Sequence, residues 1–287
     1  MLSSKREKIA ILIPPLFFLL FFLVLPLINI FVFSFWSIDS NSGILKPDFT
    51  FSNYLIFFSK YMYLQSFLRT LEVTIIVVFI TLVCAYPTCY FLAFFVQPKF
   101  QTFILFLVIL PSWSSLLIRT FSWMVVLRPN GFIDYILNFM ELYDQPLNLL
   151  YTKTAAIIGL VHIYLPFMIL PIYSCLKNFD LSLISTARSL GASPIRAFLR
   201  ITLPLSLSGV ITGIFLVSLP VFGAFITPKL LGGTRDIMLG NVIEMQFKDL
   251  YNWPFGAAIS SIITLILLLS LFLFNKFIGL NKLFNSR

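Results

Sequence analysis

The residue types that most often carry chemistry are scarce in this sequence. There is one histidine, His162, and there are three cysteines, Cys84, Cys89 and Cys175, all in or at the ends of apolar runs. No two cysteines form a CxxC pair, so we interpret them as small buried hydrophobic residues rather than as disulfide partners or metal ligands. No HxxxH, GxSxG or GxxxxGK[ST] pattern occurs. These absences argue against a catalytic residue, a metal site or ATP binding in this chain.

The composition is that of an integral membrane protein. Of the 287 residues, 59% are hydrophobic and only 11% are charged, and the mean hydropathy is +0.98. A soluble globular protein carries about 25% charged residues, so this chain lacks the polar surface of a soluble enzyme. We expect an all-α protein with six transmembrane helices, because a crossing needs about 20 apolar residues. The six stretches that qualify are 9–35, 71–96, 102–127, 154–176, 205–228 and 255–278.

The distribution of basic residues predicts how these spans are oriented. If the N-terminus is inside, the inner segments hold eleven Lys and Arg against two acidic residues, whereas the outer segments hold eight against nine. Both termini are therefore expected to be cytoplasmic. This asymmetry accounts for the net charge of +9 without a nucleic-acid partner. We expect residues 1–8 to be a cytoplasmic N-terminus and residues 9–287 to be a single transmembrane domain with a cytoplasmic loop at 177–204.

The loop at 177–204 has a pattern that predicts two helices joined by a tight turn. Gly191 suits the left-handed conformation in which helices often end. Ser193 and Pro194 suit the N-cap and first position of a second helix, which would continue rigidly into the fifth span. The first helix would carry apolar residues four and three apart on one face: Leu183, Ala187 and Leu190. Such a loop can pass a push from outside the bilayer into the membrane.

This loop resembles the EAA loop of ABC-importer permeases, a coupling helix that sits in a groove of the cytoplasmic ATPase subunit. The glycine and the later Ile-x-Leu-Pro of that motif are both present, whereas Ser185-Thr186-Ala187 stands where the family has Glu-Ala-Ala. The missing acidic residue puts one polar contact to the ATPase in question. The resemblance assigns ATPase coupling to Ala187, Leu190, Gly191, Ile201, Leu203 and Pro204.

Residues 110–120, 164–168 and 231–258 narrow the resemblance to the permease subunits of spermidine/putrescine importers, and Trp253-Pro-Phe-Gly-Ala-Ala points most directly to that branch. The resemblance implies a MetI-like permease architecture, a place in the bacterial inner membrane, and inward movement of polyamines by alternating access. It also implies three kinds of partner. They are a second permease resembling PotC, a cytoplasmic ATPase dimer resembling PotA that binds ATP and Mg²⁺, and an external polyamine-binding protein resembling PotD.

A polyamine is a flexible chain of protonated amines, so this resemblance implies a pathway with aromatic faces and carboxylates or carbonyls. Trp113, next to a proline in the third span, is the preferred residue for a cation–π contact, with an interfacial anchor as the alternative. Glu72 would meet the amines at the outer end of the second span, and its alternatives are a solvated charge or a contact to the binding protein. The full set of candidates is Trp113, Tyr164, Phe222, Phe225 and Glu72.

Other residues within the spans receive packing roles. Arg119, a charge inside the third span, is expected to form a structural pair or to extend toward the outer interface. His162 is expected to bond to a neighbouring helix. Gly209 and Gly213 let another helix approach closely, and we consider a helix of the second permease for that place.

Three alternatives remain open. An ABC permease for another small solute, such as ferric ion or thiosulfate, shares parts of the pattern. A secondary transporter driven by an ion gradient would need acidic residues inside the membrane, which are nearly absent, and would not need the coupling-loop spacing. A membrane enzyme would need clustered His, Asp, Glu or Ser motifs. The sequence favours a non-catalytic transport subunit.

Overall fold

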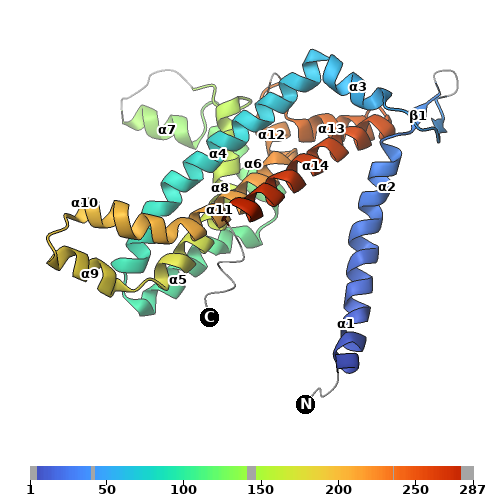
Figure 1. Cartoon of the computed structure of the whole chain (residues 1–287). Helices are drawn as coiled ribbons and strands as arrows, with labels where there is room; N and C mark the ends of the chain where they lie inside the picture. Colours follow the sequence, from blue (N-terminus) through green and yellow to red (C-terminus); the bar gives the residue numbers. More distant parts are fainter. Residues whose placement is uncertain (1–4, 40–42, 141–146, 235, 279–287) are drawn as a thin grey trace. The chain divides into compact units, whose positions relative to one another are not determined.

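The computed structural model describes residues 5–39, 43–140, 147–234 and 236–278, which are mainly helical (Figure 1). The chain divides into two compact units, Met1–Leu64 with Val242–Arg287, and Gln65–Asn241. Five helical stretches of the described chain are long and apolar enough to cross a membrane, and a bent pair of helices makes a sixth. The prediction of an all-α protein with six candidate spans is therefore confirmed.

The first unit combines the N-terminal helix, a short hairpin and the last span. Its two strands pair antiparallel, with Ser37 opposite Lys46. α2 and α3 both pack on α14, and the Tyr63 ring lies 4.8 Å from that of Phe255. The elements are α1 (Lys5–Leu19), a π-helical turn (Leu20–Val24), α2 (Leu25–Phe33), β1 (Ser37–Ile38), β2 (Leu45–Lys46), α3 (Ser52–Ser59), α14 (Trp253–Ile278) and α13 (Leu239–Lys248), whose first three residues, 239–241, belong to the second unit.

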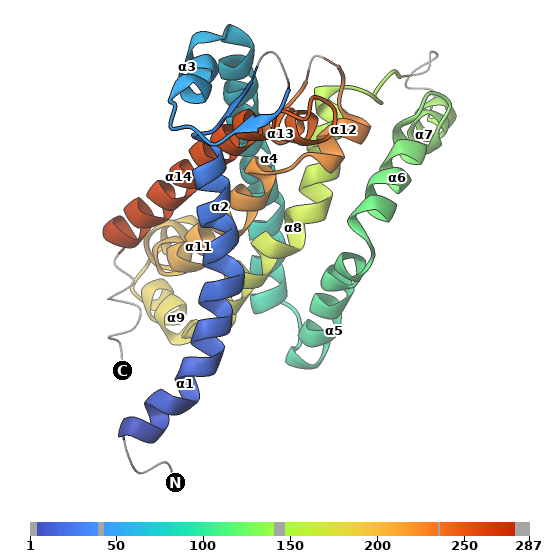
Figure 2. The same cartoon turned by 90° about the vertical axis from the view of Figure 1, so that its right-hand side faces the viewer.

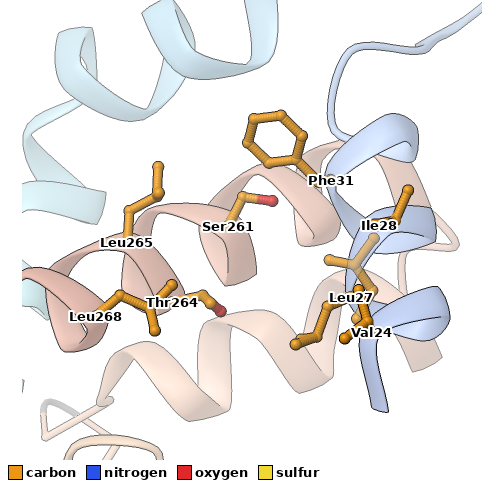
Figure 3. A pocket seen from close by; sticks show the side chains of 9 residues that line it. Val24, Leu27, Ile28, Phe31, Ser261, Thr264, Leu265 and Leu268 are labelled. Carbon is orange, nitrogen blue, oxygen red and sulfur yellow. The ribbon is translucent and has the colours of Figure 1, made fainter. Parts of the chain in front are cut away.

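Between α2 and α14 lies a crevice of about 230 Å³. Figure 3 shows Leu27 and Phe31 on one side, with Ser261, Thr264 and Leu265 on the other. Apart from those two hydroxyl groups the lining is apolar, and the Thr264 hydroxyl already donates a hydrogen bond to a carbonyl of its own helix. The crevice therefore has no charged group with which to hold a cation.

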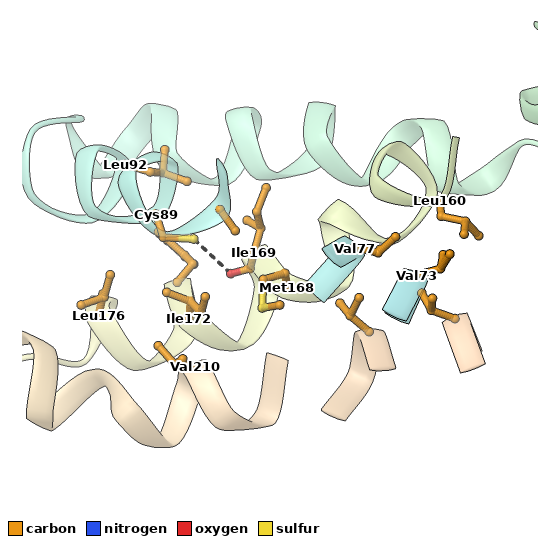
Figure 4. Close-up of a cluster of buried hydrophobic side chains, with 14 of the residues drawn as sticks. Val73, Val77, Cys89, Leu92, Leu160, Met168, Ile169, Ile172, Leu176 and Val210 are labelled. Atoms are coloured by element: carbon orange, nitrogen blue, oxygen red, sulfur yellow. Dashed lines mark hydrogen bonds between the residues drawn. The ribbon is translucent and has the colours of Figure 1, made fainter. Parts of the chain in front are cut away.

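The second unit packs α4, α8 and α11 around a continuous apolar core. Figure 4 shows Val77, Leu160 and Met168 at different levels of this core, and all three are fully buried. Cys89 lies in this core and its thiol donates a hydrogen bond to the Ile169 carbonyl at 3.3 Å. The elements are α4 (Tyr61–Phe94), α5 (Pro98–Ile109), a 3₁₀ turn (Leu110–Trp113), α6 (Leu116–Leu127), α7 (Phe132–Phe139), α8 (Lys153–Lys177), α9 (Leu181–Ser189), α10 (Pro194–Ala197), a π-helical turn (Phe198–Thr202), α11 (Leu203–Phe222) and α12 (Ile226–Leu231).

The interpretation of the cysteines as buried residues is correct for Cys89 only. Cys175 is half-buried, with its sulfur 3.3 Å from the Ser208 hydroxyl, and Cys84 is exposed on the surface of α4. An exposed position on a spanning helix is still apolar in its surroundings, because the solvent there is lipid.

α8 and α11 approach each other closely at Gly209 and Gly213. A Cβ atom at Gly209 would lie 2.7 Å from the Pro171 carbonyl oxygen, and one at Gly213 would lie 2.6 Å from the Met168 sulfur. Both distances are shorter than real side chains allow, so the two glycines are required for this helix pair. They serve a contact inside the chain, and the suggestion that they face a second permease is wrong.

The third span is broken rather than continuous. α5 ends at Ile109, and a 3₁₀ turn containing Pro111 follows it. α6 then begins after Ser115, whose side chain accepts a hydrogen bond from the Leu117 N–H. The two halves, the second one counted through α7, are bent by 92°, and Figure 2 shows the non-helical connection between α5 and α6. Proline in a helix removes one backbone donor and clashes with the preceding turn, which accounts for the position of the break.

Two other boundaries differ from the expected ones. α4 begins at Tyr61, ten residues before the predicted start of the second span, so the preceding outer loop is shorter than expected. α11 ends at Phe222 rather than at residue 228, and α12 begins only at Ile226. Phe225 therefore lies in the connection between two helices and not on the fifth span. Between α6 and α8 lies a further short helix, α7, which covers Phe132–Phe139.

Candidate coupling hook and substrate pathway

The loop between α8 and α11 forms a hook of two short helices, which we define as residues 181–202 (Figure 1). Gly191 has φ +85°, and the Ser193 side chain accepts a hydrogen bond from the Arg196 N–H at 3.3 Å. The predicted glycine turn and N-cap are thus confirmed. Asp180 caps α9 by accepting the Ser182 N–H at 2.9 Å, and this bond holds the pKa of Asp180 below its ordinary value of 3.8.

The tip of the hook exposes large apolar side chains. Leu190 is 84% exposed and Ile195 is 73% exposed, while the side chains of Arg188 and Arg196 beside them are also exposed. No other atom lies within 4 Å of the place a Cβ would take on Gly191. An apolar tip with basic residues around it has the character of a surface that another protein covers.

The hook joins the fifth span through a π-helical turn that covers residues 198–202. Pro204 follows this turn and has no N–H to donate to the carbonyl one turn earlier, which disturbs the regular α-helical ladder there. The N-terminal helix repeats the arrangement, because Pro26 follows its own π-helical turn at 20–24. Ile201 and Leu203 are half-buried and Pro204 is exposed. The helix nevertheless runs without a gap from Pro194 to Phe222, as the continuity with the fifth span predicts.

The four aromatic candidates for the pathway do not form one cluster. Trp113 is 75% exposed at the break of the third span, and its ring meets Phe106 edge-on at 5.7 Å. Tyr164 is half-buried on α8, with its ring 6.2 Å from that of Phe167. Phe222 is only 5% exposed and packs against a phenylalanine of α4, which makes it a core residue. Of these three residues, Trp113 and Tyr164 are more exposed than Phe222, and the fourth candidate, Phe225, is 36% exposed.

Glu72 is already paired within the chain. Its carboxylate accepts a hydrogen bond from the Lys153 ammonium, which joins α4 to the first residue of α8. The two side chains are 52% and 34% exposed. An amine that reached this carboxylate would therefore have to replace an ammonium group that belongs to the protein.

Arg119 of α6 and His162 of α8 are polar residues within the candidate spans. Arg119 lies close enough to His162 and Tyr164 for its charge to act on both side chains. Within the described part of the chain, the buried Arg119 Nε and His162 Nδ1 atoms have no hydrogen-bond partner. The His162 ring instead packs edge-on against Trp123 at 5.6 Å. The expected hydrogen bond from His162 to a neighbouring helix is thus not formed through this nitrogen.

Comparison with known proteins places this geometry in a family, although no family model matches the chain. Over 272 residues the chain is 36% identical to the spermidine/putrescine transport system permease protein PotB of Salmonella typhimurium (strain LT2), covering 95% of this chain and 93% of that protein. It is 37% identical to PotB of Escherichia coli (strain K12), covering 89% and 92%. It is 36% identical to PotB of Haemophilus influenzae over all 287 residues. The chain belongs to the PotB permease family.

Solved structures agree with the fold of a PotB-type permease. A bacterial ABC transporter involved in the import of the acidic polysaccharide alginate matches with a TM-score of 0.71, covering 95% of this chain and 97% of that one at 16% identity. The same kind of transporter, in complex with an alginate pentasaccharide-bound periplasmic protein, matches with a TM-score of 0.72 and 92% coverage of both chains. A PotB-family chain is a transport subunit embedded in the inner membrane and not an enzyme.

Two charged residues of this PotB-type chain form contacts that the sequence does not predict. Lys153 is one, because it lies 81 positions from Glu72 and nothing in a sequence pairs them. Asp134 is another: both of its carboxylate oxygens accept backbone N–H groups, those of Asn130 and Leu147. The Asn130-Gly131 pair is the local sequence signal for a turn at this place, and Asn130 has φ 56° there.

Proposed function

We propose that this chain moves spermidine and putrescine inward as one membrane subunit of an ATP-driven importer. The observation that carries the proposal is the identity of 36–37% to PotB over 89–100% of the chain. The hook at 181–202, with its turn at Gly191, supports the proposal, because a permease driven by a separate ATPase needs a cytoplasmic element of this kind. Both termini are cytoplasmic in this proposal, as the distribution of basic residues predicts.

The complex contains three further kinds of subunit. A second permease resembling PotC completes the pathway, and a cytoplasmic ATPase dimer resembling PotA binds ATP and Mg²⁺. An external protein resembling PotD delivers the polyamine. The exposed apolar tip at Leu190 and Ile195 supports the ATPase contact, because burial of a large apolar side chain contributes about 1.5–3 kcal/mol.

Transport proceeds by alternating access. Closure of the ATPase dimer on ATP displaces the hook, the helix from Pro194 to Phe222 tilts with it, and the cavity opens outward to accept the polyamine. Hydrolysis returns the cavity to the inward-facing state. A membrane potential that is negative inside favours cation entry by about 2.3 kcal/mol per charge per 100 mV, so a tight anionic site within the membrane is not required.

The protonated amines would meet aromatic faces and carboxylates along the pathway. Trp113 and Tyr164 are accessible enough for cation–π contacts, which contribute about 0.5–2 kcal/mol each. Glu72 would accept an amine at the outer end of α4. Phe225 is 36% exposed beside the start of α12. Its carbonyl already accepts hydrogen bonds from the Lys229 N–H and the Asn241 side chain, so its ring is the group that it would offer to an amine.

The deciding experiment is uptake of labelled spermidine into vesicles that contain this chain with its partner permease, ATPase and binding protein, with and without ATP. We expect ATP-dependent uptake that excess putrescine blocks and that ferric ion or thiosulfate does not. Assembly with stimulated ATPase activity but without spermidine uptake would support an ABC permease for another solute. Uptake that follows an ion gradient and ignores ATP would support a secondary transporter.

A further inference from the structure

The end of the hook is attached to α4 as well as to α11. The Phe198 ring, in the π-helical turn, lies between two tyrosines of α4. It meets Tyr86 edge-on at 5.7 Å and 90°, and Tyr90 at 5.8 Å and 80°. Near the start of α11, the Ser206 hydroxyl lies 2.8 Å from the Tyr86 hydroxyl. Ser206 is buried, with 1% of its surface exposed. Displacement of the hook would break these contacts or carry α4 with it.

The outer part of α4 is attached to the segment that follows α12. The Thr70 hydroxyl accepts a hydrogen bond from the Leu239 N–H at 2.8 Å and donates one to the Ser66 carbonyl at 2.7 Å. Thr70 and Leu239 are both fully buried. Water or lipid headgroups cannot reach this bond. Its loss would leave a buried N–H group without a partner, which destabilises the folded chain.

α4 is continuous between these two attachments. Helical backbone runs from Tyr61 to Phe94, and the rise of 1.5 Å per residue places Thr70 and Tyr86 about 24 Å apart along the axis. The face between them is buried through Val73, Val77 and Thr81, with the Thr81 hydroxyl bonded to its own helix. A closely packed helix transmits displacement over such a distance because protein interiors have low compressibility.

We propose that α4 is a rigid link that carries movement between the hook and the outer segment at Leu239. Phe198, Tyr86 and Ser206 are positioning residues at its inner attachment, and Thr70 is the positioning residue at its outer attachment. The proposal rests on the proposed coupling of this chain to an ATPase. Through this link, ATP-driven movement of the hook reaches the outer surface by a route separate from α11, and docking of the binding protein outside reaches the ATPase by the same route.

The test compares Phe198→Leu, Tyr86→Phe and Thr70→Val with two matched controls in the reconstituted four-component complex. Phe91→Leu removes an exposed ring of α4 that stacks only on its helical neighbour Phe95 among the contacts described. Thr88→Val removes a threonine hydroxyl that bonds one turn back, as Thr70 does, but from an exposed position. The readouts are spermidine taken up per ATP hydrolysed and the stimulation of ATPase activity by the binding protein.

We expect each attachment variant to lower both readouts at least fivefold while assembly and unstimulated ATPase activity stay within twofold of wild type, as do the controls. The double variant Phe198→Leu/Thr70→Val should be no worse than the stronger single variant, because either break interrupts the same link. Unchanged coupling in assembled variants, or additive losses in the double variant, would overturn the proposal. Stimulation of the ATPase by the binding protein can be measured even if spermidine is not the solute, so failure of the link and failure of the proposed function give different results.

Discussion

The Lys153 ammonium rests on the Glu72 carboxylate at the junction of α8 and α4. Both side chains are partly exposed, and ion pairs of this kind contribute about 0–1 kcal/mol. In the pathway that we propose, a protonated amine of the substrate would therefore exchange with Lys153 at little net cost. The pair suits a pathway that must bind a cation and then release it.

The first prediction follows from this exchange. Lys153→Met should lower the apparent KM for spermidine uptake about threefold to fivefold, because about 1 kcal/mol of competition is removed. Glu72→Gln should raise the KM by a similar factor. Uptake kinetics at saturating ATP measure both. If the two variants instead lose assembly to the same degree, the pair fastens two helices and has no part in amine recognition.

The second prediction concerns the turn of the hook. Gly191 has φ +85°, a conformation that costs a β-branched residue about 1–2 kcal/mol or more. Gly191→Val should abolish ATP-coupled uptake while membrane insertion remains intact, and Gly191→Asn should retain most uptake because asparagine tolerates this conformation. Since a Cβ would meet no atom within 4 Å inside the chain, a failure of the asparagine variant to couple would point to a partner surface that touches the glycine itself.

The third prediction tests the close approach of α8 and α11. Gly209→Ala should lower the stability of the isolated chain by about 1–3 kcal/mol, because its Cβ would lie 2.8 Å from that of Cys175. Gly223→Ala is the control, since the nearest atom to its Cβ would be 4.0 Å away. Thermal unfolding in detergent measures both. If the two variants were equally stable and only Gly209→Ala lost assembly, Gly209 would lie at an interface between subunits instead.

The fourth prediction is a pH dependence at the start of the hook. Hydrogen bonds from Ser182 depress the pKa of Asp180 below 3.8 in the folded chain. The stabilisation from this cap is therefore present above pH 3.8 and is lost as the pH falls through the lower folded value. Amide exchange in α9 should accelerate over that acidic range, and Asp180→Ala should give fast exchange already at neutral pH. Unchanged exchange in Asp180→Ala would show that the cap does not hold α9.

Residues that restrict the local backbone predicted the structure of the hook most reliably. Gly191, Ser193 and Pro194 each restrict the chain to few conformations, so the turn and the second helix of the hook followed from residue types alone. The apolar run lengths likewise gave the number of spans. These features depend on neighbours in the sequence and need no knowledge of the rest of the fold.

Contacts between distant segments were not predictable. Phe198 looks like any other of the 34 phenylalanines until α4 brings Tyr86 and Tyr90 around it. The proline beside Trp113 is visible in the sequence, but the bend of 92° in the third span depends on how the flanking helices pack. Gly209 was correctly recognised as a site of close approach, and only the packing of α11 on α8 reveals which helix comes near.

The π-helical turn at 198–202 fixes the rotational setting of the hook about the axis of the fifth span. A π-helical turn contains one residue more than the α-helical turn it replaces, and each residue of an α-helix advances the chain by about 100°. Deleting one residue from this turn would restore regular winding and swing Leu190 and Ile195 by roughly that angle. One additional residue in this turn thus sets the direction in which Leu190 and Ile195 face. An insertion or deletion here would turn the apolar tip away from that direction.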